Sequence, residues 1–394
     1  MEKTNINSPR SVNPCTSCSM CAALCPVQCI SIVSDTDGFL RPVTDEDKCI
    51  GCGLCVKVCY KFDHEVQPQP QPAGQLYAAV ADEATVNVCT SGGVGDVLAW
   101  YLTSQGIKCA GVVYDDKERC ARHIVTDNPA DTRHFRGSKY IQSYTVDAFR
   151  QLVAEVSSTR YAVFGLPCHI YALHRWLTLR GLRDNCLLID LYCHGCPTRN
   201  AFTKCAASLE ARMPEGAVPL SLRFRDPGLP WGKTYELALT YRDSSGAEGR
   251  IADKDFYRLF FSDLLLNESC YDCRLRSTLV YTDIRIGDFW GPLYAGNTRG
   301  VSAVSVVTPQ GKAIMAEVSD RLTLTRHDYS QLLPYQSYGK IYKYPRKVRS
   351  RMLKQLADPE IPVAVTISTL HRNKPLKSRL RYALRQFLKR FSSR

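Results

Sequence analysis

Residues 15–26 read CTSCSMCAALCP, and residues 49–60 read CIGCGLCVKVCY. Each run holds four cysteines separated by two, two and three residues, namely Cys15, Cys18, Cys21 and Cys25 in the first and Cys49, Cys52, Cys55 and Cys59 in the second. Where one chain carries two [4Fe–4S] clusters, three closely spaced thiolates hold one cube and the fourth cysteine of the run ligates the other cube. The repeated spacing therefore predicts two [4Fe–4S] clusters.

The predicted ligand sets cross between the two runs. Cluster one takes Cys15, Cys18, Cys21 and Cys59, and cluster two takes Cys49, Cys52, Cys55 and Cys25. Zinc is the alternative, because C-x2-C pairs also build zinc ribbons, but tetrahedral zinc gives no reason for the additional cysteines. The segments 30–33 and 39–43, turned by Asp37-Gly38, predict a β-hairpin. We therefore expect an α+β ferredoxin-like domain over residues 1–64.

Composition limits the class of protein. The chain has 394 residues and 19 cysteines. No apolar run approaches the roughly 20 residues that a membrane-spanning helix needs, and residues 1–12 are polar where a secretory signal would be apolar. We therefore expect a cytoplasmic protein. Because that compartment keeps thiols reduced, metal sites explain the cysteines better than disulfides do.

The formal charge of +13 is concentrated at the C-terminal end of the chain. Nine Lys or Arg residues lie between Arg372 and Arg394, and no Asp or Glu follows Glu360. The remaining chain offers no strongly basic surface, so we expect no nucleic-acid partner. Six apolar residues share one stripe of a predicted basic amphipathic helix over 376–391: Leu376, Leu380, Leu384, Phe387, Leu388 and Phe391. Two interpretations remain, peripheral contact with an anionic membrane on its inner face and packing on the protein's own body.

Between the cysteine-rich start and the basic tail, the pattern changes twice. Residues 67–72 read QPQPQP, which predicts a stiff, extended connector within a linker over 65–76. Residues 77–345 alternate strand-like and helix-like patterns, which predicts an α/β body with a mixed sheet. Strands are expected over 109–114, 161–165, 186–192, 222–225, 235–241, 283–288 and 302–307, and helices over 95–104, 146–156, 170–179, 199–212, 255–267 and 311–321. Residues 346–394 are predicted to form the basic helical tail.

Two glycine-containing loops in the body suggest a phosphate-bearing cofactor. Thr90, Ser91, Gly92 and Gly93 precede a helical pattern, where backbone N–H groups and the helix dipole favour an anion. Gly137, Ser138 and Lys139 form a second loop, flanked by Arg136 and Tyr140. On this interpretation Gly92→Val blocks close approach of the cofactor. The alternatives are an ordinary glycine-rich turn and a solvated loop.

Seven short motifs, in a fixed order, carry a family resemblance. They are Cys89–Gly93 (CTSGG), Gly137–Ser143 (GSKYIQS), Gly165–His169 (GLPCH), Cys193–Gly195 (CHG), Phe224–Asp226 (FRD), Cys270–Cys273 (CYDC) and Ile286–Gly291 (IGDFWG). Together they resemble the coenzyme F420 hydrogenase/dehydrogenase beta-subunit family, in its form with a fused N-terminal ferredoxin. The resemblance implies an FAD-binding α/β body with an iron–sulfur cluster beside the flavin. Some relatives are associated with cell-surface polysaccharide synthesis, so the resemblance also suggests a role in cell-surface polysaccharide metabolism.

In the light of this resemblance, the body cysteines suggest a third [4Fe–4S] cluster. Its expected ligands are Cys168, Cys193, Cys270 and Cys273. Cys196 is the alternative fourth ligand, and ordinary buried thiols are the alternative for all of them. His169 and His194 each follow an expected ligand, so each is a candidate catalytic proton carrier, with a structural histidine as the alternative.

The predicted function is that of an iron–sulfur flavoprotein oxidoreductase. It would pass electrons between an organic two-electron donor or acceptor at FAD and the [4Fe–4S] clusters, with a redox protein or a small molecule as partner. Two alternatives remain. One is an electron-transfer subunit that lacks a substrate site and feeds a partner enzyme, and the other is an interaction protein whose metals are structural.

Overall fold

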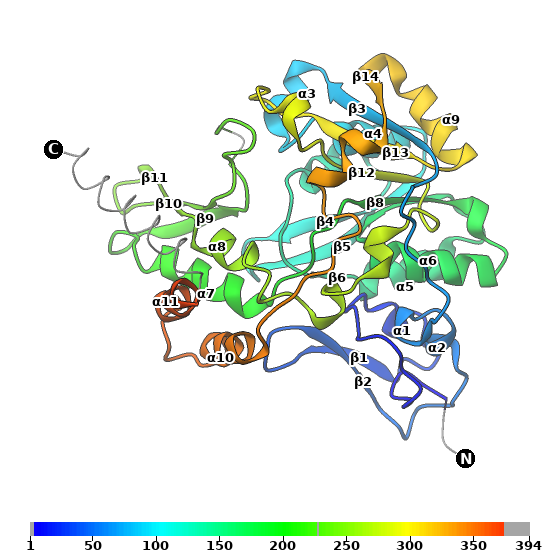
Figure 1. Cartoon of the computed structure of the whole chain (residues 1–394), viewed down its shortest axis with the longest axis horizontal. Coiled ribbons are helices and arrows are strands. Elements are labelled where there is room, and N and C mark those ends of the chain that lie inside the picture. Colours follow the sequence, from blue (N-terminus) through cyan, green and yellow to red (C-terminus); the bar gives the residue numbers. More distant parts are fainter. Residues whose placement is uncertain (1–3, 227, 374–394) are drawn as a thin grey trace.

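The computed structural model describes residues 4–226 and 228–373. Its N-terminal module, dark blue in Figure 1, has two one-turn helices and an antiparallel hairpin. These elements are α1 (Met20–Ala23), β1 (Ile30–Ser34), β2 (Leu40–Thr44) and α2 (Leu54–Lys57). At the hairpin turn, Gly38 has a φ of +83°, a left-handed conformation that glycine adopts readily. The hairpin and the ferredoxin-like character of this module are as predicted.

In the part of the chain that the structure describes, nine body strands form one mixed sheet in the order β14-β3-β13-β12-β8-β7-β4-β5-β6. The central strands β12, β8, β7 and β4 run parallel, and β13, β3 and β14 run antiparallel to their neighbours. Strand β5 runs antiparallel to β4 and parallel to β6. The bounds are β3 Gln75–Ala81, β4 Lys108–Asp115, β5 Cys120–Thr126, β6 Ser143–Tyr144, β7 Tyr161–Gly165, β8 Cys186–Leu191, β12 Ile284–Asp288, β13 Ser302–Val306 and β14 Leu322–His327. The predicted mixed sheet is confirmed.

Helices cover this sheet and a smaller one. Those of the main sheet are α3 (Glu83–Val88), α4 (Val94–Ser104), α5 (Val146–Glu155), α6 (Pro167–Leu179) and α9 (Pro309–Glu317). The smaller sheet is antiparallel, in the order β11-β10-β9, with β9 Val218–Arg223, β10 Leu237–Arg242 and β11 Glu248–Asp253. Beside it lie α7 (Arg199–Glu210), α8 (Asp255–Phe260), α10 (Arg346–Ala357) and α11 (Val363–Arg372). Three short 3-10 helices matter below: η2 (Pro129–Phe135), η4 (Glu268–Cys270) and η5 (Arg274–Ser277).

The ferredoxin module shares a hydrophobic core with the body. Met20, Val58 and Tyr60 of the module belong to the same buried cluster as Ile170 and Trp176 of α6. All five side chains are at most 5% exposed. In Figure 1 the module accordingly lies directly against α5 and α6. Burial of apolar area stabilises this contact by about 25 cal/mol per Å². The module and the body therefore pack together as one unit.

The predicted elements agree best with the structure where the sequence is most apolar. The strand predicted over 161–165 is observed with those bounds. The helix predicted over 255–267 ends instead at Phe260, because Asp263 has a φ of +60° and Leu266 then forms a bridge with Pro197. Strand β3 was missed, because its sequence QLYAAVA is rich in alanine, which is depleted in strands.

The linker segment runs along the body. Gln69 donates its backbone N–H to the carbonyl of Ser277 (2.7 Å), and its own carbonyl accepts from the hydroxyl of Tyr338 (2.8 Å). The amphipathic helix predicted over 376–391 lies outside the described residues. Within them, no helix has the length and apolar character that crossing a membrane requires.

Candidate functional site

The thiols predicted for cluster one line a single cavity. Its walls include Cys15, Cys18, Cys21 and Cys59. The first three come from the loop before α1 and from α1 itself, and Cys59 follows α2. Ser17 and Ser19 in this loop have φ values of 62° and 61°, a strained conformation of the kind that concentrates at functional sites. The loop therefore bends so that its cysteines face one space.

A second cavity is lined by the thiols predicted for cluster two. These are Cys25, Cys49, Cys52 and Cys55. Gly51 and Gly53 have positive φ values of 66° and 70°, which lets the loop curl around the space. The cavities thus group each run's first three cysteines with the last cysteine of the other run.

Cys29 is a neighbour of cluster two that the cysteine spacing did not reveal. It lines the same cavity, and its Sγ lies 3.4 Å from the Sγ of Cys25. Its backbone N–H also donates to the Cys25 sulfur at 3.3 Å. N–H groups directed at a ligating sulfur tune the potential of a cluster. In the sequence, this contact is indicated only by the spacing of four residues between Cys25 and Cys29.

Five body cysteines gather against cluster one. Burial raises the pKa of the Cys168 thiol, and neighbouring thiols raise it further, namely those of Cys18, Cys196, Cys193 and Cys273. Cys270 is held in the same group, because its sulfur accepts the backbone N–H of Cys196 at 3.4 Å. Cys168 lies in the first turn of α6, where the helix dipole favours an anionic ligand. The four predicted ligands of the third cluster and the alternative Cys196 are therefore neighbours.

A buried cation lies beside these thiols without a carboxylate. Arg276 is 3% exposed; its Nη1 donates to the carbonyl of His194 (3.0 Å) and its Nη2 to that of Lys340. Its Nε has no hydrogen-bond partner, and within residues 4–226 and 228–373 it forms no ion pair with an acid. The Arg276 charge instead lowers the pKa of the Cys193 thiol against the upward effect of burial. Because an uncompensated buried charge is costly, these residues fit an anionic cluster.

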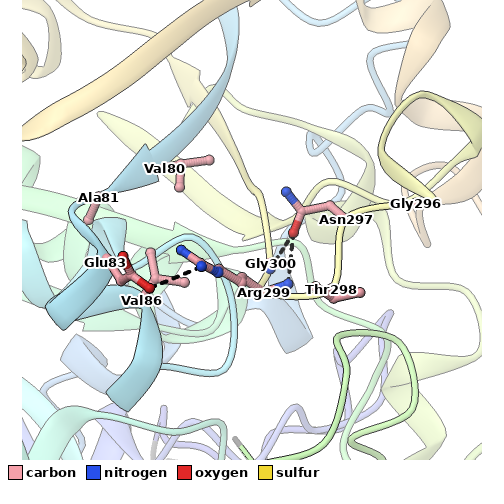
Figure 2. Close-up of a pocket in the computed structure, with 9 residues that line it drawn as sticks. All are labelled: Val80, Ala81, Glu83, Val86, Gly296, Asn297, Thr298, Arg299 and Gly300. Carbon is pink, nitrogen blue, oxygen red and sulfur yellow. Dashed lines mark hydrogen bonds and ion pairs between the residues drawn. The ribbon is translucent and has the colours of Figure 1, made fainter.

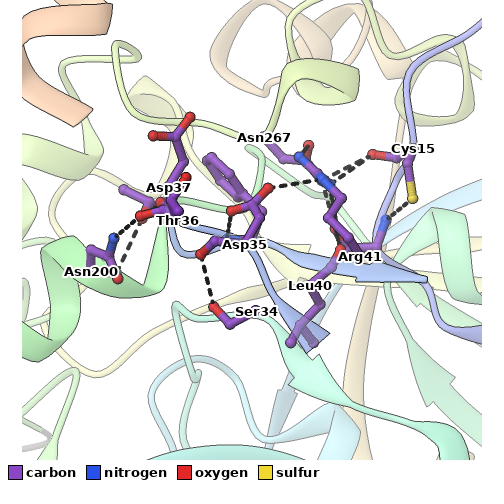
Figure 3. Close-up of polar contacts among 12 residues, drawn as sticks. Cys15, Ser34, Asp35, Thr36, Asp37, Leu40, Arg41, Asn200 and Asn267 are labelled. Atoms are coloured by element: carbon purple, nitrogen blue, oxygen red, sulfur yellow. Dashed lines mark hydrogen bonds and ion pairs between the residues drawn. The ribbon is translucent and has the colours of Figure 1, made fainter. Parts of the chain in front are cut away.

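The third group and cluster one are joined by polar contacts from Asn267 and Arg41 (Figure 3). Asn267 donates from Nδ2 to the Ser17 hydroxyl (3.0 Å) and to the Cys15 carbonyl (3.2 Å), and its backbone N–H donates to the carbonyl of Cys196 (2.8 Å). Arg41 donates to the side-chain oxygen of Asn267 at 3.2 Å and to the Ser17 hydroxyl at 2.9 Å. One asparagine thus contacts the loops of both cysteine groups.

The hairpin turn of the module docks at the start of α7. The carbonyl of Gly38 accepts the backbone N–H of Arg199 at 3.0 Å, and Asn200 donates to the carbonyl of Thr36 at 3.0 Å (Figure 3). A Cβ on Gly38 would lie 2.6 Å from the Thr198 hydroxyl. Gly38 is therefore required by the docking contact as well as by the turn.

Tyr60 makes a further contact between module and body. It occupies the position after Cys59, where the first run has Pro26. Its hydroxyl accepts the backbone N–H of Arg274 at 3.4 Å, one residue after Cys273. Its ring is 3% exposed. Tyrosine at this position thus fills the space between the last ligand of cluster one and the body thiols.

The two glycine loops predicted to bind a cofactor lie next to each other. The hydroxyls of Thr90 and Ser138 are 3.5 Å apart. Gly93 is the N-cap of α4 with a φ of +81°. Gly137 has a φ of +78°, and a Cβ there would meet nothing within 4 Å. The structure thus brings residues 90–93 and 137–138 together and leaves open space at Gly137.

Other members of this predicted set have structural roles. Ser91 donates to the carbonyl of Val301 at 3.2 Å. Lys139 donates its three N–H groups to the carbonyls of His134, Phe135 and Arg136, at 3.2, 2.9 and 2.8 Å. A lysine has only three donors, so Lys139 holds the end of η2 rather than a phosphate.

Arg136 is likewise engaged, because it forms a two-point ion pair with Asp96 of α4 at 2.7 and 3.0 Å. Neither cation that the sequence placed beside this loop is free for a pyrophosphate.

Gly92 is required for packing, which changes the expected effect of Gly92→Val. A Cβ at Gly92 would lie 2.2 Å from the carbonyl oxygen of Ala79 and 2.6 Å from the backbone nitrogen of Ser302. We expect this variant to lose several kcal/mol of stability, at the upper end of single substitutions, whatever its effect on a cofactor. Thermal unfolding measures the loss. Gly137→Ala is the matched change in open space, with an expected cost of about 1–2 kcal/mol from its left-handed backbone. Equal unfolding temperatures for the two variants would contradict this.

The two histidines predicted as proton carriers differ in environment. His169 is fully buried; its Nδ1 accepts the backbone N–H of Leu166 at 3.3 Å, and burial holds its pKa well below the usual value. A neutral histidine that accepts the N–H of the residue before α6 has a structural role. His194 is partly exposed, and its Nε2 lies 2.7 Å from Asp263 Oδ1. His194 remains the candidate proton carrier.

A group of residues around Arg225 was missed as a site, although its motifs were noted. Arg225 is 3% exposed and pairs with Asp288 at 2.9 Å. The other oxygen of Asp288 accepts the indole N–H of Trp231 at 3.1 Å, and Trp231 stacks on Trp290 with ring centroids 4.7 Å apart. The FRD and GDFW motifs therefore meet in space. Only the fold could show this, because the two motifs lie more than sixty residues apart.

Figure 2 shows the residues that line a further cavity, of about 400 Å³. It is lined by Val80, Ala81, Glu83, Val86, Gly296, Asn297, Thr298, Arg299 and Gly300. The ion pair of Arg299 with Glu83, at 3.0 Å, crosses it, and both side chains are largely exposed. None of the residues predicted to bind a cofactor lines this cavity.

Among residues 4–226 and 228–373, no three Cys, His, Asp or Glu side chains are grouped as ligands of a metal ion. A [4Fe–4S] cube spreads its four thiolates over four iron atoms, so its ligands surround a space rather than meet at a point. Both cavities have that form, one lined by the four predicted thiols of cluster one and the other by the four of cluster two together with Cys29.

Comparisons with known proteins identify both parts of the chain. Residues 14–61 match the model of the 4Fe-4S dicluster domain, and residues 158–331 match the model for the C terminus of the coenzyme F420 hydrogenase/dehydrogenase beta subunit. These matches define an iron–sulfur protein related to oxidoreductases. Residues 158–331 are thus similar to the coenzyme F420 hydrogenase/dehydrogenase beta-subunit family, and residues 14–61 to a dicluster ferredoxin domain. The resemblance drawn from the seven motifs is confirmed.

Individual relatives match parts of the chain. An uncharacterized protein of Methanocaldococcus jannaschii is 27% identical over 203 residues, which are 45% of this chain and 55% of that protein. NADH-quinone oxidoreductase subunit I of Pelobacter propionicus is 43% identical over 54 residues, 11% of this chain and 28% of its own length. A chain of the F420-reducing [NiFe] hydrogenase complex from Methanosarcina barkeri is 14% identical, with a TM-score of 0.45 over 77% of this chain and 93% of that one. The chain thus spans about half or less of the curated relatives that it matches.

Proposed function

We propose that this protein passes electrons between an organic two-electron compound at bound FAD and three [4Fe–4S] clusters, two in the ferredoxin module and one in the body. FAD exchanges electrons in pairs with organic compounds and singly with iron–sulfur clusters. The observation that carries the proposal is the group of five body cysteines beside Arg276, a buried cation without a carboxylate. The body cluster would be held by Cys168, Cys193, Cys270 and Cys273.

The contacts between module and body support an order for the clusters. Cys18 is a predicted ligand of cluster one. After burial, its thiol is the largest cause of the raised pKa of Cys168. Tyr60 and Asn267 also connect the cluster-one loops to those of the body thiols. Cluster two lies farther out, with Cys52 exposed. Electrons would therefore move between the body cluster and cluster one, and between cluster one and cluster two.

Cluster two would be the point of contact with a redox partner protein. The Cys52 side chain is exposed, and the neighbouring Ile50 is 63% exposed. An exposed apolar residue beside an electron carrier suits a brief encounter with a second carrier, since weak redox complexes bury little area.

The flavin part of the proposal is supported by three features. Thr90 and Ser138 meet, Gly137 faces open space, and Arg225 has a buried N–H group without a partner. Thr90, Ser138 and the backbone at Gly93 and Gly137 would hold the phosphates. His194, hydrogen-bonded to Asp263, would hold the proton that accompanies reduction of the organic compound.

One observation favours a second candidate function, an electron-transfer subunit without a substrate site. Arg136 and Lys139, the two cations of the predicted cofactor loop, are both bound to other parts of the protein. A pyrophosphate in this loop would have to rely on hydroxyl and backbone donors.

Anaerobic purification followed by iron, sulfide and flavin analysis distinguishes these functions. The proposal requires about twelve irons per chain, four for each of three cubes, together with one FAD. About twelve irons without FAD, even after incubation with excess FAD, would establish the electron-transfer subunit instead. Zinc in place of iron would overturn both.

A further inference from the structure

Arg225 has an N–H group that nothing in the protein uses. Its Nε donates to the hydroxyl of Thr234 at 2.8 Å, and its Nη1 donates to Asp288 at 2.9 Å. Its Nη2 is buried and has no partner. Leaving a buried donor unsatisfied costs about 1–3 kcal/mol. A buried guanidinium with one free edge is therefore suited to an acceptor that arrives with a ligand.

The surroundings of this guanidinium are aromatic. Its carbon lies 4.8 Å from the ring centroid of Tyr235, and the rings of Tyr140 and Trp290 lie 6.1 Å from the same ring. Burial raises the pKa of Tyr140 and of Tyr235, so both phenols stay protonated at neutral pH. Asp288 is thus the negatively charged partner of Arg225. The aromatic side chains around them favour a flat ring as a ligand.

This aromatic group is continuous with the predicted phosphate loop. Tyr140 follows Ser138 by two residues, and the Ser138 hydroxyl lies 3.5 Å from that of Thr90. A single short segment therefore runs from the hydroxyls assigned to the phosphates to the rings around Arg225. A cofactor with a phosphate end and a flat ring end matches this layout.

We propose that Arg225 binds the carbonyl edge of the FAD ring and favours its reduced anion over its oxidised form. The inference rests on the proposed function. Reduction of FAD by two electrons and one proton gives FADH−, whose negative charge is spread over the carbonyl-bearing ring. The electrons come from the organic donor or, in the opposite direction, from the clusters. A fixed cation at that edge binds the anion more strongly than the neutral ring, and so raises the two-electron potential.

The test compares Arg225→Met with the wild-type chain by two measurements, FAD affinity and the two-electron potential of the bound FAD. We expect the variant to bind oxidised FAD within about threefold of wild type and reduced FAD at least tenfold more weakly. For a two-electron couple, tenfold corresponds to a potential lower by about 30 mV. Arg250→Gln is the matched control, since Arg250 is 44% exposed and pairs with Asp226 and Glu236 instead.

Two further variants keep the test decisive if Arg225→Met fails to fold with an unpaired Asp288. Arg225→Lys keeps a charge for Asp288 but lacks the second arm of the guanidinium, and the double variant Arg225→Met with Asp288→Asn removes both charges. Both are expected to lower the potential. Unchanged potentials in all variants that bind FAD would overturn the inference alone. A wild-type chain with a full set of iron that binds no FAD would overturn it together with the flavin part of the proposed function.

Discussion

Replacing Cys273 by alanine is expected to remove one third of the iron, from about twelve atoms per chain to about eight, because one of three cubes loses a ligand. The ferredoxin clusters should remain, since their thiols line separate cavities. Iron and sulfide analysis of anaerobically purified protein measures the change. Electron paramagnetic resonance of the reduced protein should show that the signals of the two remaining clusters persist.

Cys205→Ala is the matched control for this experiment. Cys205 is 1% exposed, lies on α7 and is not one of the five gathered thiols. Its removal should leave the iron content unchanged. The same assay decides the fourth ligand: Cys168→Ala should lose about four irons and Cys196→Ala should lose none. Full iron content in Cys273→Ala would rule out the body cluster.

Replacing Arg276 by methionine is expected to lower the midpoint potential of the body cluster by on the order of 60 mV, which is a tenfold change for a one-electron couple. Reduction would add negative charge to the proposed cluster, and the buried Arg276 cation would stabilise that charge. Its removal therefore favours the oxidised state. A redox titration followed by electron paramagnetic resonance measures the shift.

Arg276→Lys keeps the charge and is expected to shift the potential less than Arg276→Met. Arg326→Gln on the edge strand β14 removes an exposed cation and should leave the potential unchanged. If Arg276→Met kept the wild-type potential while retaining all its iron, the role of Arg276 would be limited to its bonds with the carbonyls of His194 and Lys340.

The ferredoxin module was predictable because its signal is local. Eight cysteines in two runs specify both ligand sets, and the Asp37-Gly38 turn specifies the hairpin between them. The body strands were predictable where apolar runs are continuous, as in β7 and β8. Strand order was not, because it depends on contacts between segments far apart in the chain.

Residue type alone misled the prediction where a side chain or a glycine has a packing role. Lys139 lies in the predicted cofactor loop, yet its ammonium is used up by three carbonyls of η2. Gly92 resembles a glycine that admits a phosphate, yet the backbone of β3 fills the space where its side chain would be. In contrast, the sequence could not show the free N–H groups of Arg225 and Arg276, although Arg225 lies in the FRD motif, because a free N–H group becomes visible only when all neighbours are placed.

The docking of the ferredoxin module has a kinetic consequence. Gln69 attaches the linker to the body, and the Gly38 turn and Asn267 fix the module at two further points. A free ferredoxin must collide with its donor, so its rate falls on dilution and varies with salt. In this chain the transfer proposed between the body cluster and cluster one would be a first-order event within one molecule. Its rate should therefore be independent of protein concentration and ionic strength, and only the later encounter at cluster two should depend on either.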